Sequence, residues 1–131
     1  MIGLDTNVLV RYIMQDDPVQ EALATCLLES LTADAPGYVP VVALVELYWV
    51  LSSCYDLDRP QLIEAVEGLL HTQVIVVENA EVVWKAVRTY RMGSADFPDC
   101  LIASVAATVG CLQTMTFDRK AVKHAGMTLI E

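Results

Sequence analysis

Hydrophobic residues along this chain recur at two spacings, which together predict alternating strands and helices. Five short apolar runs are typical of buried strands, at residues 1–5, 38–40, 73–77, 111–116 and 127–130. Seven longer segments with helical spacing predict helices, at residues 6–15, 17–32, 40–55, 58–71, 79–93, 96–109 and 118–124. This alternation predicts an α/β fold, with a central, mostly parallel sheet of about five short strands flanked by helices.

Capping residues mark the ends of several of these helices. Asp17 followed by Pro18 suits the start of a helix, because the aspartate accepts hydrogen bonds and proline tolerates the first turn. Asn79 is expected to open the helix that Gly93 ends. No linker, repeat or low-complexity tract interrupts the 131 residues, so we expect a single domain over residues 1–131.

Composition narrows the class of protein. Hydrophobic residues make up 55% of the chain, yet no uncharged apolar run approaches the ~20 residues that a membrane span requires. The opening MIGLDTNVLV lacks the basic region of a secretion signal, and we therefore expect a cytoplasmic protein without a membrane segment. We attribute the surplus of apolar residues to a buried parallel sheet and a subunit interface.

The cysteines and histidines limit the kind of metal site. Four cysteines without CxxC spacing favour buried, reduced thiols over disulfides or a zinc site. Only two histidines are present, so a histidine-rich site is not expected. Any metal would then be held by oxygen atoms, which favours Mg²⁺ or Mn²⁺.

Four acidic residues lie within or at the end of apolar segments: Asp5, Glu46, Asp99 and Asp118. Glu46 is the only charged residue in VVALVELYWVL (41–51), where a lone carboxylate is expected to be costly to desolvate unless it is paired or bound to a metal. Asp5 and Asp118 each follow a strand, at the carboxyl end where open α/β sheets bind ligands.

Each of these acids also has a simpler structural explanation. Asp5 and Asp118 suit the N-caps of the helices that follow them, and neither interpretation prevails for either residue alone. Asp96 suits the N-cap of the next helix, which would place Asp99 at the third helical position, where its charge favours the helix dipole. For Glu46 the alternative is an exposed, narrow polar stripe. If the strands before Asp5 and Asp118 are central, however, those carboxylates meet at one sheet edge, which capping does not require.

Carboxylates around one or two divalent cations are the apparatus of phosphodiester hydrolysis, because the metal activates a water and neutralises phosphate charge. Polar side chains that could orient such ligands are Thr6, Asn7 and Thr116. No P-loop, GxGxxG, Ser/His/Asp elbow or HExxH motif supports a different mechanism.

The net charge of −9 argues superficially against a nucleic-acid partner. Six of the eight basic residues nevertheless follow residue 84, on either side of Asp96, Asp99 and Asp118. A basic rim around an acidic pocket suits a polyanion that is cut with the help of metal ions. A solvated helix face explains Lys85, Arg88 and Arg91 equally well.

These segments resemble the PIN-domain ribonucleases, specifically the VapC toxins of type II toxin–antitoxin modules. LDTNVLVRY (4–12) is similar to the family's first-strand motif, and VVALVELYWVL to its glutamate-bearing segment. ADFPDCLIA (95–103) resembles the stretch that carries the third acid, and TFDRKAV (116–122) resembles the fourth. The four segments occur in the family's order across essentially the whole chain.

The resemblance implies a Mg²⁺- or Mn²⁺-dependent endoribonuclease whose metal-binding catalytic acids are Asp5, Glu46, Asp99 and Asp118. ADFPD offers two aspartates, and Asp99 is assigned because it directly precedes CLIA, with Asp96 as a candidate outer ligand. The supporting residues implied by the resemblance are Thr6, Asn7 and Thr116. It also implies a homodimer and neutralisation by a cognate VapB-type antitoxin. Basic residues that are candidates for contacting the RNA substrate are Arg11, Arg88, Arg91, Arg119 and Lys120.

Two other functions were weighed. A receiver-like signalling domain needs paired acids after its first strand and a phospho-acceptor aspartate after a central strand. Asp5 is unpaired, and Asp56 and Asp58 follow a predicted helix, so this class is disfavoured. A catalytically silent PIN-like binding or regulatory module is the second alternative, and the presence of all four acids argues against it.

Overall fold

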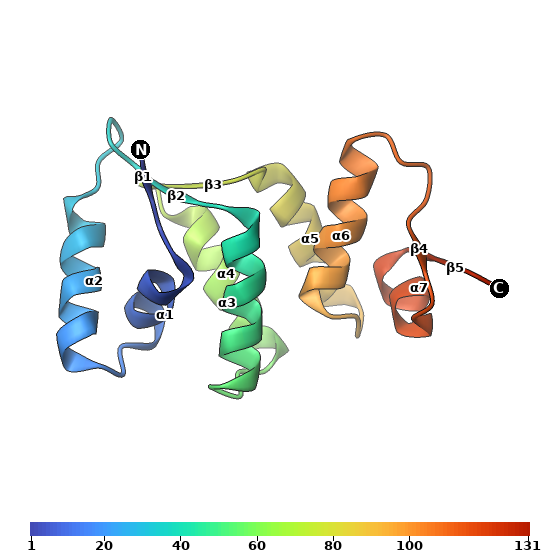
Figure 1. The fold of residues 1–131 in the computed structure, drawn as a ribbon, viewed down its shortest axis with the longest axis horizontal. Helices are drawn as coiled ribbons and strands as arrows, with labels where there is room; N and C mark the ends of the chain where they lie inside the picture. Colours follow the sequence, from blue (N-terminus) through green and yellow to red (C-terminus); the bar gives the residue numbers. More distant parts are fainter. The chain divides into compact units, whose positions relative to one another are not determined.

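The computed structural model describes residues 1–131, and the chain divides into two compact units. The first unit comprises Met1–Glu78 and the second Asn79–Glu131. Each unit has its own helices and strands (Figure 1) and its own buried core. No helix in the chain is both long and apolar enough to cross a membrane.

The first unit is a three-stranded parallel sheet with four helices. The strands are β1 (Ile2–Gly3), β2 (Gly37–Val39) and β3 (Ile75–Val77), in the order β1-β2-β3. The helices are α1 (Thr6–Met14), α2 (Pro18–Ser30), α3 (Val41–Ser53) and α4 (Arg59–His71). The central strand, β2, leads directly into α3. The edge strand β1 leads into α1.

Leucine side chains dominate the core of the first unit. Leu9 of α1 and Leu44, Leu47 and Leu51 of α3 are almost wholly removed from solvent. The last three recur at helical spacing, so one face of α3 packs inward although its sequence is apolar nearly all round. Burial of each such side chain stabilises the fold by about 1.5–3 kcal/mol before the entropy cost of ordering it.

The first turn of α3 is completed by a residue from a distant part of the sequence. Pro40 occupies the N-cap position and offers no side-chain hydrogen bond. The carboxylate of Glu78, which follows β3, instead accepts a hydrogen bond of 2.8 Å from the backbone N–H of Val41. This contact fixes the start of α3 against the end of β3 and satisfies a helix donor that would otherwise lack a partner.

The second unit contains three helices and a two-stranded parallel sheet. The helices are α5 (Ala80–Met92), α6 (Phe97–Thr108) and α7 (Arg119–Ala125), and α5 and α6 lie side by side (Figure 1). The strands are β4 (Met115–Thr116) and β5 (Thr128–Leu129). Phe97 anchors the core, and its ring meets that of Tyr90 edge-on with centroids 5.7 Å apart.

The α/β class, the parallel pairing and all seven helices expected from the sequence are confirmed. Five strands are present as expected, but they form sheets of three and two instead of one. The expected strand at 111–116 is reduced to its last two residues. There the N–H of Cys111 still bonds back to the carbonyl of Ala106 at the end of α6, which delays the extended segment.

Two local expectations need correction. All four cysteines are free, but only Cys100 is buried and the other three are exposed. Gly93 does follow α5, yet its backbone is extended (φ −130°) and does not require glycine as a left-handed cap would. Its small size matters instead, because a Cβ at this position would lie 2.8 Å from the Cβ of His124.

Candidate active site

The acids expected at the site are divided between the two units. Asp5 and Glu46 belong to the first, whereas Asp96, Asp99 and Asp118 belong to the second. Asp99 is partly buried and the other four are exposed. Neither unit on its own groups three His, Cys, Asp or Glu side chains tightly enough to hold a metal ion.

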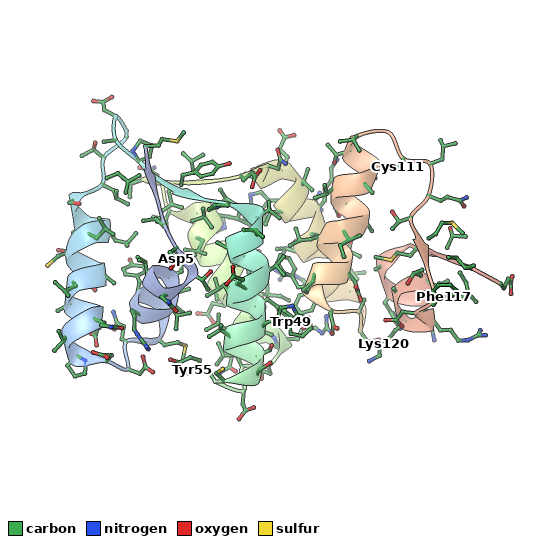
Figure 2. The ribbon with its side chains drawn as sticks, viewed as in Figure 1. Asp5, Trp49, Tyr55, Cys111, Phe117 and Lys120 are labelled. Atoms are coloured by element: carbon green, nitrogen blue, oxygen red, sulfur yellow. The ribbon has the colours of Figure 1, made fainter.

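Asp5 stands at the junction of β1 and α1, as the pattern of strand and helix predicts (Figure 2). It is the N-cap residue of α1, and its Oδ1 accepts a hydrogen bond of 2.8 Å from the backbone N–H of Thr6. Its other carboxylate oxygen makes no hydrogen bond within the chain. The capping role is therefore real, and it leaves one oxygen available to a ligand.

Thr6 carries an unsatisfied hydroxyl beside that carboxylate. The residue is only 4% exposed, and its Oγ1 has no hydrogen-bond partner. A buried polar group without a partner costs about 1–3 kcal/mol, which a valine of nearly the same shape would avoid. The hydroxyl is thus retained at a cost to stability, next to a residue of the proposed site.

Glu46 is exposed, so the expectation that it is desolvated is wrong. It lies on the face of α3 opposite the buried leucines, with Val42 and Trp49 on either side of it along the helix. Both neighbours are also largely exposed, and Figure 2 shows Trp49 projecting from α3. Glu46 therefore lies on an outward, mostly apolar helix face.

Two aspartates of the second unit, Asp96 and Asp118, act electrostatically on Asp99. Asp96 occupies the N-cap position of α6 but makes no capping hydrogen bond, and Asp99 lies three residues later in the first turn. Burial, followed by the negative charges of Asp96 and Asp118, raises the pKa of Asp99 above the ordinary value for a carboxyl group. No cationic side chain offsets these effects.

Asp118 is held in place from both sides. Its Oδ1 accepts a hydrogen bond of 2.8 Å from the N–H of Lys120, which makes it the N-cap of α7. Its own N–H donates to the hydroxyl of Thr116 at 3.0 Å, which holds the backbone of this turn. Lys120 lies at the start of α7 (Figure 2).

The side-chain chemistry of Asp96, Asp99 and Asp118 suits a hard divalent cation. All three are carboxylates, and a bound cation would offset the burial and the like charges that raise the pKa of Asp99. Carboxylate oxygens are ligands that Mg²⁺ and Mn²⁺ prefer. Asn7, the remaining expected support, is exposed and lies at a mostly apolar cavity of about 280 Å³ between α1 and α2.

Arg11, a candidate RNA contact, is engaged in a network that the sequence did not reveal. Its Nε donates to Gln20 at 2.7 Å, and one Nη donates to Asp16 at 3.1 Å and to the Tyr55 hydroxyl at 3.3 Å. Tyr55 in turn donates to Asp16 at 2.6 Å, which lowers the pKa of Asp16 and raises that of Tyr55. The network ties α1 and α2 to the end of α3, where Figure 2 shows Tyr55.

The other candidate RNA contacts lie in the second unit and are all exposed: Arg88, Arg91, Arg119 and Lys120. Lys123, one of the six basic residues after residue 84, and His124 also lie in this unit, although neither was among the expected RNA contacts. Their signal was available, since both follow Asp118 on the same short helix.

Comparison with known proteins identifies the family of this chain. The sequence model of the PIN domain matches residues 2–127, a range that includes both units and all five acids. The chain therefore belongs to the PIN-domain family, as the sequence motifs indicated. It is also similar to a VapC ribonuclease of Aquifex aeolicus (strain VF5), with 26% identity over 120 residues, covering 92% of this chain and 89% of the relative.

Proposed function

We propose that the protein is a divalent-metal-dependent endoribonuclease and the toxin of a VapBC-type module. The proposal rests on the environment of Asp99. This carboxylate is partly buried, lies near two other negative charges and has no cationic partner. Membership of the PIN-domain family over nearly the whole chain and the similarity to a VapC ribonuclease support the proposal. The chain then acts as a single PIN domain to which both units contribute residues.

In this proposal Asp5, Glu46, Asp99 and Asp118 hold Mg²⁺ or Mn²⁺, with Asp96 as an outer ligand. The cation would supply activation of water and neutralisation of charge on the scissile phosphate. The chain's own part is orientation: the N–H groups of Thr6 and Lys120 fix one oxygen each of Asp5 and Asp118. Until a cation binds, burial and the charges of Asp96 and Asp118 raise the pKa of Asp99, so they oppose the charged form of that carboxylate.

A cleavage assay tests the proposal. Purified protein is incubated with transfer, ribosomal and messenger RNA in Mg²⁺, in Mn²⁺ and in EDTA, beside the Asp5→Asn and Glu46→Gln variants. Cleavage is expected only with a divalent cation and is expected to be lost in both variants. Asp34→Asn and Glu29→Gln are matched controls, because both are exposed acids of the same unit outside the proposed set. Cleavage in EDTA, or in both site variants, would sink the metal-dependent assignment. No cleavage under any of these conditions would instead favour a silent binding module.

Thr6→Val separates function from stability at the same site. Because the hydroxyl of Thr6 is buried without a partner, its removal is expected to leave the free energy of unfolding unchanged or to raise it by up to about 1 kcal/mol. RNA cleavage is expected to fall about 10-fold, as for a group that orients a metal ligand. Urea unfolding and the cleavage assay measure the two effects. A loss of stability with full activity would show that the hydroxyl has only a structural role.

The toxin role is tested in cells. Expression of the chain is expected to arrest growth, and co-expression of a cognate VapB-type antitoxin is expected to relieve the arrest. Normal growth with an active nuclease in vitro would keep the nuclease and remove the toxin assignment. We also propose a homodimer, supported by exposed apolar side chains such as Val42 and Trp49 of α3, and sedimentation of the purified chain would reveal it.

A further inference from the structure

The second unit contains a cavity of about 360 Å³ that the proposed catalytic acids do not line. It lies between the end of α5 and the end of α7, and its lining residues are Arg88, Thr89, Met92, Gly93, Lys123 and His124. The charged residues among them are basic, and no carboxylate lines the cavity. None of the three basic side chains forms an ion pair or hydrogen bond with the rest of the chain.

This basic cavity is unusual in so acidic a protein. Residues 1–78 contain twelve acidic and two basic side chains, whereas residues 79–131 contain five acidic and six basic ones. The net charge is therefore about −10 in the first unit and +1 in the second. An arginine and a lysine that stay close together without carboxylate partners repel each other, so the arrangement suits an anion.

The shape of the cavity depends on a glycine. A Cβ on Gly93 would lie 2.8 Å from the Cβ of His124 and 3.1 Å from its Nδ1, closer than ordinary packing allows. Glycine at this position lets the imidazole close against the end of α5 and form one wall. The largely exposed side chain of Met92 adds an apolar surface at the same place, suited to a sugar or a base.

We propose that this basic cavity binds a backbone phosphate of single-stranded RNA, which rests on the proposed function and adds a substrate subsite to it. Arginine binds phosphate oxygens in a bidentate manner, and lysine adds a point charge. Lys123 follows Asp118 by five residues on α7, a rise of about 7.5 Å. The phosphate held here thus belongs to a nucleotide near the one whose bond is cut.

Binding measured without cleavage tests the subsite. A fluorescent single-stranded RNA is titrated in EDTA at several salt concentrations with wild type, Arg88→Gln, Lys123→Gln and the double variant. The double variant is expected to bind more weakly. The slope of log K against log salt is negative, and its magnitude is expected to decrease by about 0.7, the value for one phosphate contact on a single strand. Lys85→Gln is the matched control, since it removes one charge from α5 outside the cavity and should leave that slope unchanged.

Gly93→Ala provides a second variant that keeps every charge but fills the space beside His124. It is expected to weaken RNA binding, and the exposed charge variants decide the matter if it does not fold. If the double variant has the same RNA affinity and the same salt slope as Lys85→Gln, the proposed subsite is wrong. Unchanged RNA binding with loss of binding to polyglutamate would also overturn it, and would make the cavity a site for an acidic protein.

A cleavage assay separates this inference from the proposed function. The double variant is expected to raise KM while kcat at saturating RNA stays near the wild-type value, because its residues do not belong to the acid set. If wild type binds RNA through the cavity but cuts none, the subsite stands and the nuclease assignment fails. If wild type cuts RNA and the double variant has the same KM, the subsite alone fails.

Discussion

Replacing Asp99 by asparagine is expected to lower RNA cleavage by at least about 100-fold, because groups that merely orient a metal ligand already cost 10–100-fold when they are lost. Asp99 is the one acid of the set that is partly buried, and two further carboxylates act on it. The neutral amide keeps the shape of the side chain but removes its charge. The measurement is the rate of RNA cleavage at saturating Mg²⁺ or Mn²⁺.

The same variant is expected to be more stable than wild type in the absence of metal. The folded protein holds the pKa of Asp99 above its unfolded value, so the folded state binds a proton more readily than the unfolded state. The charged carboxylate therefore disfavours folding at neutral pH, and this penalty disappears as the pH falls below the ordinary carboxyl range. The stability gain of Asp99→Asn should accordingly be present at pH 7 and vanish in acid.

Thermal unfolding in EDTA across this pH range measures the gain, with Asp34→Asn as a control for the loss of an exposed aspartate. If Asp99→Asn destabilises the protein at pH 7, the carboxylate has a stabilising partner and the repulsion argument is wrong. Full activity in this variant would instead remove Asp99 from the catalytic set.

Replacing Phe97 by alanine is expected to cost about 3–5 kcal/mol, a large part of the 5–15 kcal/mol by which domains are usually stable. Phe97 is 1% exposed, and it lies between Asp96 and Asp99 in the sequence. Its ring packs edge-on against Tyr90, so the substitution removes an aromatic contact and leaves a cavity beneath the first turn of α6. The position of both aspartates depends on that turn.

Urea unfolding followed by tryptophan fluorescence measures the loss. Each unit has one tryptophan, so a Trp49→Phe background leaves Trp84 as a reporter of the second unit. Ile102→Ala is the matched control, because this residue lies on the same helix but is 55% exposed and should change stability by no more than about 0.5 kcal/mol. A loss in Phe97→Ala no larger than in the control would show that α6 is not anchored by its aromatic residue.

Helix positions were predictable because their signals are local. Asp17, which directly precedes Pro18, caps α2 through hydrogen bonds to nearby N–H groups, as expected, and Asp58 caps α4 in the same way. Strand lengths were less predictable, because a strand forms only where a neighbour pairs with it. Residues 111–114 therefore matched a strand pattern without forming a strand.

For the acids, too, local sequence predicted position but not solvent exposure. Asp5 and Asp118 could be placed at strand-to-helix junctions from the sequence. The exposure of Glu46 could not, since an almost wholly apolar helix does not reveal which face packs inward. Arg11 and Tyr55 are 44 positions apart in the sequence, and Gly93 and His124 are 31 positions apart. Sequence patterns over a few residues do not predict contacts at such separations.

The electrostatic cost of the Asp99 cluster also has a genetic consequence. An aspartate codon becomes an asparagine codon by a single base change, and here that change is expected to leave a better-folded protein. Cells selected for loss of the proposed RNA cleavage could therefore lose it by one base change, without producing an aggregating or rapidly degraded chain. The inactive product would persist at full abundance and continue to occupy any partner that recognises the folded surface.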